Sequence, residues 1–161
     1  MKLTDKLISA DRLPEWRAAF RASGRRLVVT NGCFDLLHAG HVTYLAAARA
    51  LGDALLVGLN SDASVRELKG PSRPLNSEAD RALVLAALWA VDAIAIFPER
   101  SAANFLQRAQ PDVYVKGGDY TIESINQHER GIVENAGGKI VILPVVPGRS
   151  TTAILEKIAQ L

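Results

Sequence analysis

The chain has 161 residues, of which 48% are hydrophobic and 22% charged, and its formal net charge at pH 7 is +2. These values suit a single globular domain with a full core. The charge is too small, and the basic residues too dispersed, to indicate a nucleic-acid-binding protein. The single cysteine, Cys33, excludes an internal disulfide and a cysteine-based metal cluster.

No apolar run approaches the ~18 residues of a membrane-spanning helix. Lys2, Asp5 and Lys6 interrupt any signal-peptide pattern at the N-terminus. We therefore expect a cytoplasmic protein without a membrane partner.

Residues 1–26 are predicted to be a helical segment that precedes the main domain, residues 27–161. Pro14 suits a first helical turn, and Trp16 and Phe20 lie four residues apart on one face. The segment is expected to end near Gly24 and to pack on the outside of the domain or on a second subunit.

From residue 27 onward, short apolar runs alternate with helical patterns. The helix that Ser77 caps is expected to bury Leu83, Val84, Ala87 and Leu88. Strands are predicted at 27–30, 54–60, 93–97, 113–116 and 139–143, and the other helices at about 40–52, 63–68, 101–109, 125–135 and 150–160. This alternation predicts an α/β protein with a Rossmann-like, doubly wound, five-stranded parallel sheet. The inferred strand order is 3-2-1-4-5, with the switch point between the first and fourth strands.

The first strand leads into the turn His38-Ala-Gly40-His41, which opens a helix. Two histidines three residues apart at a helix start can point to the same side, and Gly40 lets a ligand approach the backbone. Free amide groups, the helix dipole and two imidazoles together predict a phosphate site. The alternative, histidines that only cap the helix or fill the core, is less favoured for such a pair.

Further candidates lie at the same predicted edge of the sheet. Lys69 and Arg73, in a loop rich in glycine and proline, could hold phosphates or be solvated surface cations. Arg81 lies near the start of its helix, where the dipole disfavours a cation, which hints at a role toward the site. Cys33 is expected to be a small side chain beneath a nucleotide and not a nucleophile.

Two later segments repeat this pattern. Lys116-Gly-Gly-Asp119 follows the fourth strand, and its glycines would let the backbone approach a ligand. Ser150 is expected to cap the last helix, so that Ser150-Thr-Thr152 forms a second anion site.

The motif Gly32-x-Phe-Asp-Leu-Leu-His38-x-Gly-His41 after a strand resembles the signature of the nucleotidyltransferase superfamily. Five stretches are similar to the adenylyltransferases of ADP-heptose synthesis: Asn31–His41, Asn60–Val65 with Lys69-Gly70, Arg73-Pro74, Val115–Tyr120 and Gly148–Thr152. The resemblance covers nearly all of the chain from about Arg26. It implies transfer of AMP from ATP to D-glycero-β-D-manno-heptose 1-phosphate, giving ADP-heptose and pyrophosphate for lipopolysaccharide.

The resemblance also implies roles for individual residues. His38, His41 and Lys69 would be catalytic, and Asp35, Arg73 and Lys116 would contact the sugar phosphate. The nucleotide would be bound by Asn31, Gly32, Cys33, Phe34, Asp35, Gly40, Arg81, Lys116, Gly117, Asp119, Ser150, Thr151 and Thr152. We expect Mg²⁺ held mainly by the ATP phosphates, no metal-ligating side chain, and a homodimer.

Two other functions stay open. A cytidylyltransferase acting on glycerol 3-phosphate or a similar polyol or amino-alcohol phosphate would share the fold, although Arg149 replaces the isoleucine of those relatives before Ser-Thr-Thr. A nucleotide-sensing module would bind without turnover. In its family the domain occurs alone or fused behind a sugar kinase, and this chain is expected not to phosphorylate heptose.

Overall fold

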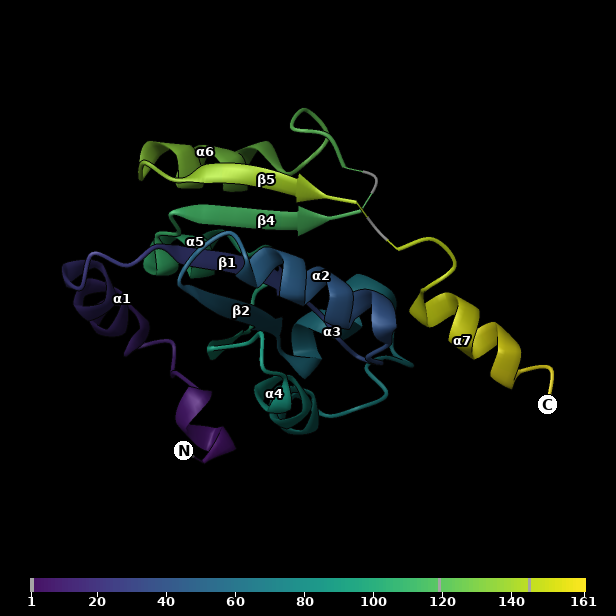
Figure 1. The fold of residues 1–161 in the computed structure, drawn as a ribbon. Coiled ribbons are helices and arrows are strands. Elements are labelled where there is room, and N and C mark those ends of the chain that lie inside the picture. Colours follow the sequence, from purple (N-terminus) through teal and green to yellow (C-terminus); the bar gives the residue numbers. More distant parts are fainter. Residues whose placement is uncertain (1, 119, 145) are drawn as a thin grey trace.

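Five parallel strands form one sheet in the order β3-β2-β1-β4-β5, which confirms the predicted order and fold class (Figure 1). The computed structural model describes residues 2–118, 120–144 and 146–161. The strands are β1 Leu27–Gly32, β2 Ala54–Asn60, β3 Ala93–Phe97, β4 Val113–Gly117 and β5 Lys139–Leu143. The helices are the 3₁₀ turn η1 Leu3–Lys6, α1 Leu13–Ala22, α2 Ala39–Arg49, α3 Asp62–Lys69, α4 Glu78–Ala87, α5 Ala103–Ala109, α6 Gln127–Asn135 and α7 Thr151–Ile158.

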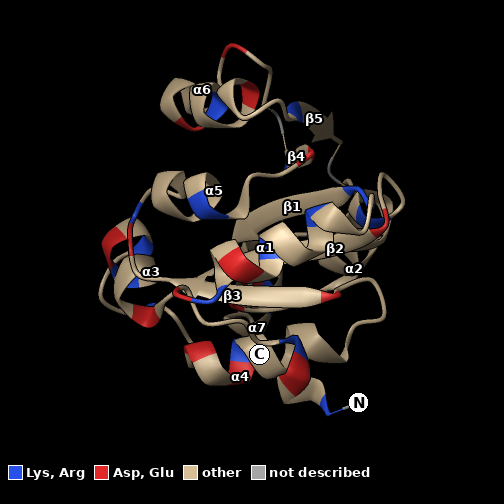
Figure 2. Ribbon diagram, turned by 90° about the vertical axis from the view of Figure 1, so that its left-hand side faces the viewer, with Lys and Arg blue, Asp and Glu red and all other residues tan. Residues whose placement is uncertain are grey.

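Helices cover both faces of the sheet because side chains on successive strand residues point to opposite faces. On one face, Val29 and Leu56 pack with residues of α1, α5 and α6. On the other, Val28 and Leu55 pack with residues of α2 and α4. Acidic and basic residues are interspersed along the helices in Figure 2. No helix among the described residues is both long and apolar enough to cross a bilayer.

The N-terminal segment packs on this same body. Leu13 and Phe20 of α1 belong to the core, and Trp16 stacks on Phe20 with 5.4 Å between ring centroids, on the face that the spacing predicts. The expectation that Leu7 and Ile8 are helical is wrong. Leu7 bridges Ile94, and the amide of Ile8 donates to the Ile94 carbonyl, because the outer edge of β3 offers unpaired backbone groups.

The prediction that Leu83, Val84 and Ala87 face the core is also wrong. Leu83 is 47% and Val84 50% exposed, whereas Ala82 and Leu85 are fully buried. The buried Arg81 side chain, which bonds to the ends of two strands, turns the helix so that this other face points inward. The order of apolar residues in α4 is compatible with burial of either face of the helix.

Helix α7 stands apart from the layered body. None of its residues is buried, and Figure 1 shows it projecting from the end of the sheet where the arrowheads of β4 and β5 point. Its N-cap is Ser150, whose hydroxyl accepts from the Ala153 amide at 3.1 Å, as predicted. The predicted cap Ser77 is confirmed in the same way, by a bond from the Asp80 amide, and Ser61 caps α3 by a bond from the Ser64 amide.

Candidate active site

A cavity of about 730 Å³ lies at the carboxyl ends of the strands, beside the switch point between β1 and β4. In sheets of this kind, ligands bind at that place. Most of the predicted site residues line it: Asn31, Gly32, Cys33, Phe34, Asp35, His38, Gly40, His41, Lys69, Lys116, Gly117, Ser150, Thr151 and Thr152. Asp119 lies outside the described residues.

The two histidines are stacked at the start of α2. Their ring centroids are 3.9 Å apart, and the His38 carbonyl accepts from the His41 amide at 2.9 Å. The Nδ1 atoms of both rings are buried without a hydrogen-bond partner among the described residues. A Cβ on Gly40 would lie 2.9 Å from His38 Nδ1 and 3.1 Å from the Cβ of Arg149, so only glycine permits this packing.

Both imidazoles are held neutral. Burial, the neighbouring His38 and the Lys69 ammonium lower the pKa of His41 from 6.5 to about 4. Burial and then the Arg149 guanidinium lower the pKa of His38. Neutral rings can each donate one N–H to a phosphate oxygen, and an arriving polyanion would favour their protonation. The pair is therefore suited to bind an anion whose charge increases during a reaction.

The pKa of His41 makes folding stability dependent on pH. Between about 4 and 6.5 the unfolded histidine binds a proton and the folded one does not, so stability is full above pH 6.5 and falls as the pH drops toward 4. The full shift corresponds to about 3 kcal/mol, and the partial exposure of the ring to solvent reduces this. Relative to His41→Asn, we therefore expect the wild type to lose about 2 kcal/mol more unfolding free energy over this range. Urea denaturation at several pH values measures the difference, and parallel curves for the two proteins would contradict it.

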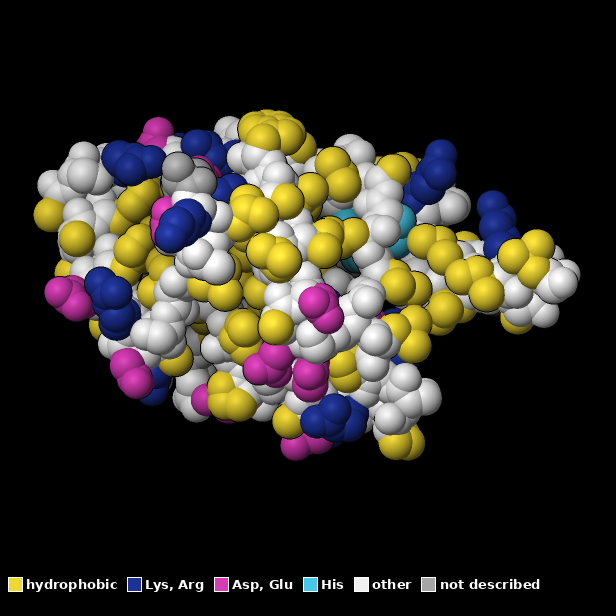
Figure 3. Space-filling model, turned by 90° about the horizontal axis from the view of Figure 1, so that it is seen from below, with side chains coloured by type: hydrophobic (Ala, Val, Ile, Leu, Met, Phe, Trp, Pro, Cys, Tyr) yellow, Lys and Arg dark blue, Asp and Glu magenta, His cyan; other side chains and the backbone are white. Residues whose placement is uncertain are grey.

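The start of α7 lies beside the histidine turn, since a Cβ on Gly40 would be 3.1 Å from the Cβ of Arg149. Ser150, Thr151 and Thr152 line the cavity, and the Thr151 hydroxyl donates to the Leu36 carbonyl at 3.4 Å. This bond fixes the N-terminus of α7 against the loop that precedes α2. Figure 3 shows histidine side chains in a hollow where the projecting C-terminal segment leaves the body. Two helix N-termini and two histidines thus surround one part of the cavity, an arrangement that favours bound phosphate.

Asp35 lines the cavity, but its carboxylate is bound by the protein. It is 5% exposed and accepts from Arg73 Nε at 2.7 Å and from the amides of Leu75 and Asn76. Burial alone would raise its pKa, yet these hydrogen bonds and the guanidinium hold the pKa below its usual value. Asp35 therefore fastens the loop between α3 and α4.

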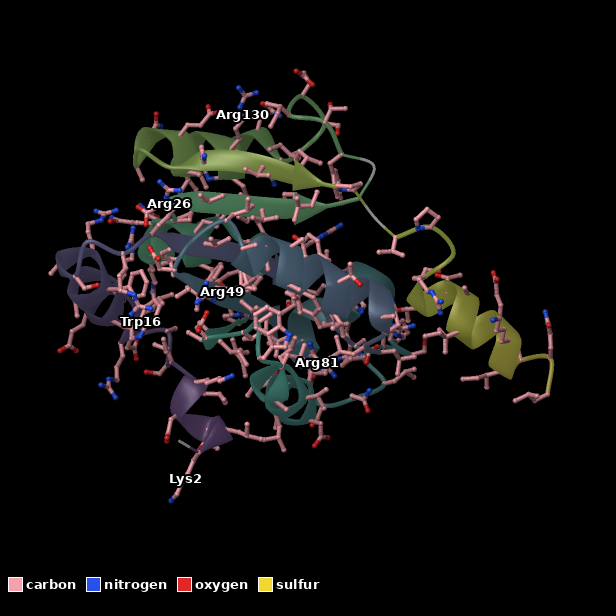
Figure 4. The ribbon with its side chains drawn as sticks, viewed as in Figure 1. Lys2, Trp16, Arg26, Arg49, Arg81 and Arg130 are labelled. Carbon is pink, nitrogen blue, oxygen red and sulfur yellow. The ribbon has the colours of Figure 1, made fainter. Side chains whose placement is uncertain are left out.

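Arg73 and Arg81 do not line the cavity, contrary to the sequence interpretation. Arg73 is the ion-pair partner of Asp35. Arg81 donates to the carbonyls of Cys33, Asn60 and Asn76 and to Asp62 Oδ1. Figure 4 places Arg81 between α4 and the body of the domain. A guanidinium can satisfy several carbonyls at once, so it acts as a structural clamp beneath the site.

Cys33 lies on the cavity wall as a thiol. Burial raises its pKa, although the nearby Lys69 and Arg81 charges oppose this change. A thiol is a poor nucleophile compared with a thiolate. We expect Cys33→Ser to keep turnover within about twofold of the wild type, because the two side chains have similar size and neither is ionised. Steady-state kinetics measures this; loss of turnover in a folded variant would mean that the thiol takes part.

Lys116 and the backbone of β4 form the remaining wall. A Cβ on Gly117 would lie 2.6 Å from the Tyr44 ring, so glycine is required at this position. Lys116 Nζ lies 3.5 Å from Asn31 Oδ1 and 5.7 Å from the centre of the Tyr120 ring. Burial lowers the pKa of Lys116, and Glu129 partly offsets this.

The sequence interpretation missed several residues of the cavity wall: Tyr44, Asn60, Leu68, Arg100, Tyr120, Ile125, Asn126, Glu129, Val146 and Arg149. Asn60 ends β2 and Arg100 follows β3, so the strand-end rule that selected Lys116 applied to them as well. Glu129 lies within a helix, where no sequence signal separates it from a solvated carboxylate.

The described residues contain no group of three or more histidine, cysteine or carboxylate side chains that could hold a metal ion. Asp35 and Glu129, the carboxylates on the cavity wall, already accept hydrogen bonds from the protein. The donor set thus suits a cation that enters with a bound nucleotide better than a resident metal.

Comparison with known proteins agrees with this geometry. The sequence model of the cytidylyltransferase-like family matches residues 29–157. The bifunctional protein HldE of Trichlorobacter lovleyi is 50% identical over 155 residues, and HldE of Rhodopseudomonas palustris is 53% identical over 158 residues. These matches cover 96% and 95% of this chain but 31% of each relative, so the chain spans about a third of their length.

Two solved structures share the fold. A lipopolysaccharide core biosynthesis protein from Thermoplasma volcanium superposes with a TM-score of 0.62 and 27% identity, covering 76% of this chain and 98% of that one. A pantoate-beta-alanine ligase from Francisella tularensis gives a TM-score of 0.62 at 14% identity, over 96% and 78% of the two chains, which speaks for the fold alone. The strand order, the stacked histidine pair and the family match together place this chain in the cytidylyltransferase-like family.

Proposed function

We propose that this chain is an adenylyltransferase that transfers AMP from ATP to D-glycero-β-D-manno-heptose 1-phosphate and releases pyrophosphate. The product would be ADP-heptose for lipopolysaccharide core synthesis. Identity of about 50% to HldE over nearly the whole chain supports this, as does the similarity to a lipopolysaccharide core biosynthesis protein.

The observation that carries the proposal is the stacked His38/His41 pair in the same cavity as the N-terminus of α7. Nucleotidyl transfer consists of in-line attack by a phosphate oxygen on the α-phosphorus, and charge develops on the equatorial oxygens and on the leaving pyrophosphate. Catalysis of such a step rests on positioning and on electrostatic stabilisation.

Each described group has a part in that step. The imidazoles of His38 and His41 donate hydrogen bonds to phosphate oxygens, and Lys69 neutralises charge on the triphosphate. The hydroxyls and amides at Ser150–Thr152 bind phosphate from the start of α7. ATP would enter as its Mg²⁺ complex, and the ion would supply charge neutralisation from its place on the phosphates.

The test is pyrophosphate release with ATP or CTP, each combined with heptose 1-phosphate or glycerol 3-phosphate. We expect release only with ATP and heptose 1-phosphate. Release with CTP and glycerol 3-phosphate would instead identify a cytidylyltransferase, a function that the name of the matching family favours. Nucleotide binding without release in any combination would favour a sensing module.

We also propose a cytoplasmic homodimer. Apolar side chains exposed on η1, on α4 and just beyond α4 support an interface there, among them Trp89, which is 74% exposed. Sedimentation velocity of the wild type and of Trp89→Glu tests this. A wild-type dimer that the substitution dissociates would support it, and a wild-type monomer would contradict it.

A further inference from the structure

Glu129 of α6 is a buried carboxylate at the side of the cavity formed by β4, α5 and α6. It is 7% exposed. Its Oε1 accepts from the Ser101 hydroxyl at 3.0 Å and from the Ala102 amide at 2.9 Å, and its Oε2 lies 3.2 Å from the Tyr114 hydroxyl. One side chain therefore joins α6 to the start of α5 and to β4.

Through Tyr114, Glu129 is connected to Asn31, which lines the cavity. Tyr114 is 1% exposed, and its one hydroxyl proton is shared between Asn31 Oδ1 at 2.6 Å and Glu129 Oε2 at 3.2 Å. Asn31 Oδ1 also lies 3.5 Å from Lys116 Nζ. Because Asn31 Oδ1 is engaged in this way, the NH₂ group of Asn31 is the donor that a ligand in the cavity would meet.

Through Ser101, Glu129 is connected to Arg100, a second cation of the cavity wall besides Lys116. Arg100, which directly precedes Ser101, lines the cavity. Glu129 thus fixes the backbone beside Arg100 through one oxygen, and Asn31 and Lys116 through the other.

The cations of the cavity wall fall into two groups. Lys69 and Arg149 belong to the first, together with the neutral imidazoles of His41 and His38, whose pKa values these two cations lower. Arg100 and Lys116 belong to the second, which Glu129 organises. A reaction between two phosphate-bearing molecules must bring two anions together, and separate groups of cations reduce their repulsion.

We propose that Glu129 is a positioning residue for the acceptor substrate, holding Arg100, Asn31 and Lys116 where they bind the phosphate of the sugar 1-phosphate. This proposal rests on the proposed function, because it assigns the first group of cations to the triphosphate. It gives the buried carboxylate a role that acts through other residues, without contact to the reacting atoms.

The test compares Glu129→Gln with Glu134→Gln, a matched change at an exposed position of the same helix. In Glu129→Gln, an NH₂ group replaces one carboxylate oxygen and cannot accept a hydrogen bond. Either the contacts with Ser101 and Ala102 or the contact with Tyr114 is then lost, so we expect KM for the sugar phosphate to rise ~10-fold. KM for ATP and kcat should stay within ~2-fold, because the first group of cations is unchanged. Glu134→Gln should match the wild type.

Two further variants separate positioning from mere folding. Tyr114→Phe removes only the hydroxyl and should raise the same KM ~3- to 10-fold. In a Lys116→Ala background, Glu129→Gln should add less than it does alone, since part of its effect acts through Lys116. Additive effects, equal rises in both KM values, or a lower melting temperature with unchanged KM would overturn the proposal.

Binding of the sugar phosphate alone, measured by calorimetry, keeps this proposal separate from the proposed function. Weakening of binding by ~10-fold in Glu129→Gln would support the positioning role even if no nucleotide gave turnover. Equal binding by wild type and variant would overturn the positioning role even if the wild type made ADP-heptose.

Discussion

His41→Ala should reduce kcat by about 10²–10³-fold, comparable to the removal of one donor from an oxyanion hole. The reason is geometric: His41 stacks on His38 at 3.9 Å, at the N-terminus of α2, with Lys69 nearby. Its hydrogen bond to the phosphate should strengthen as charge develops in the transition state. The loss should therefore fall on kcat more than on KM for ATP.

The matched control for this variant is His128→Ala, which removes the remaining histidine, an exposed residue of α6. Its turnover should equal that of the wild type. Steady-state pyrophosphate release measures both proteins, and melting curves confirm that each is folded. A wild-type rate in folded His41→Ala would refute the assignment of the histidine pair to catalysis.

Arg81→Ala should cost about 3–5 kcal/mol of unfolding free energy, because it removes a buried charge from its partners. The Arg81 side chain is 1% exposed, and its guanidinium donates to three carbonyls and to Asp62. Alanine would leave these acceptors without this donor, two of them at the ends of β1 and β2. Urea denaturation measures the change.

Arg81→Lys is the second variant to test, since an ammonium keeps the charge but cannot span all four acceptors. It should be destabilised by an intermediate amount. The control is Arg66→Ala, at an exposed position of α3, which should change stability by less than about 0.5 kcal/mol. If Arg81→Ala were as stable as Arg66→Ala and raised KM for ATP, the original interpretation of Arg81 as a nucleotide ligand would be correct after all.

The fold was largely predictable because its signals are local. Each strand is a short apolar run, and each of Ser61, Ser77 and Ser150 caps a helix through a bond to a residue three positions later. A single parallel sheet with right-handed crossovers then leaves few possible strand orders. The exceptions, Leu7 with Ile8 and the buried face of α4, are places where a tertiary contact outweighed the local pattern.

The cavity was predictable where the motif lies in one continuous turn. His38, Gly40 and His41 share one helix start, so their mutual placement follows from helix geometry. Arg73 and Arg81 looked equivalent to Lys69 in the sequence, yet carbonyls and a carboxylate contributed by distant segments bind both guanidiniums. Nothing in their local sequence encodes those partners.

The sequence by itself determined most of the elements, the strand order and the turn that carries the histidine pair, because these depend on spacing within a few residues and on general rules of chain connection. Only the tertiary structure decided which cations face the cavity and that Glu129, Tyr114 and Asn31 lie in one chain of contacts. Those contacts join residues 15 and 83 positions apart. The physical reason is that a buried polar group must find its partner wherever the fold brings one.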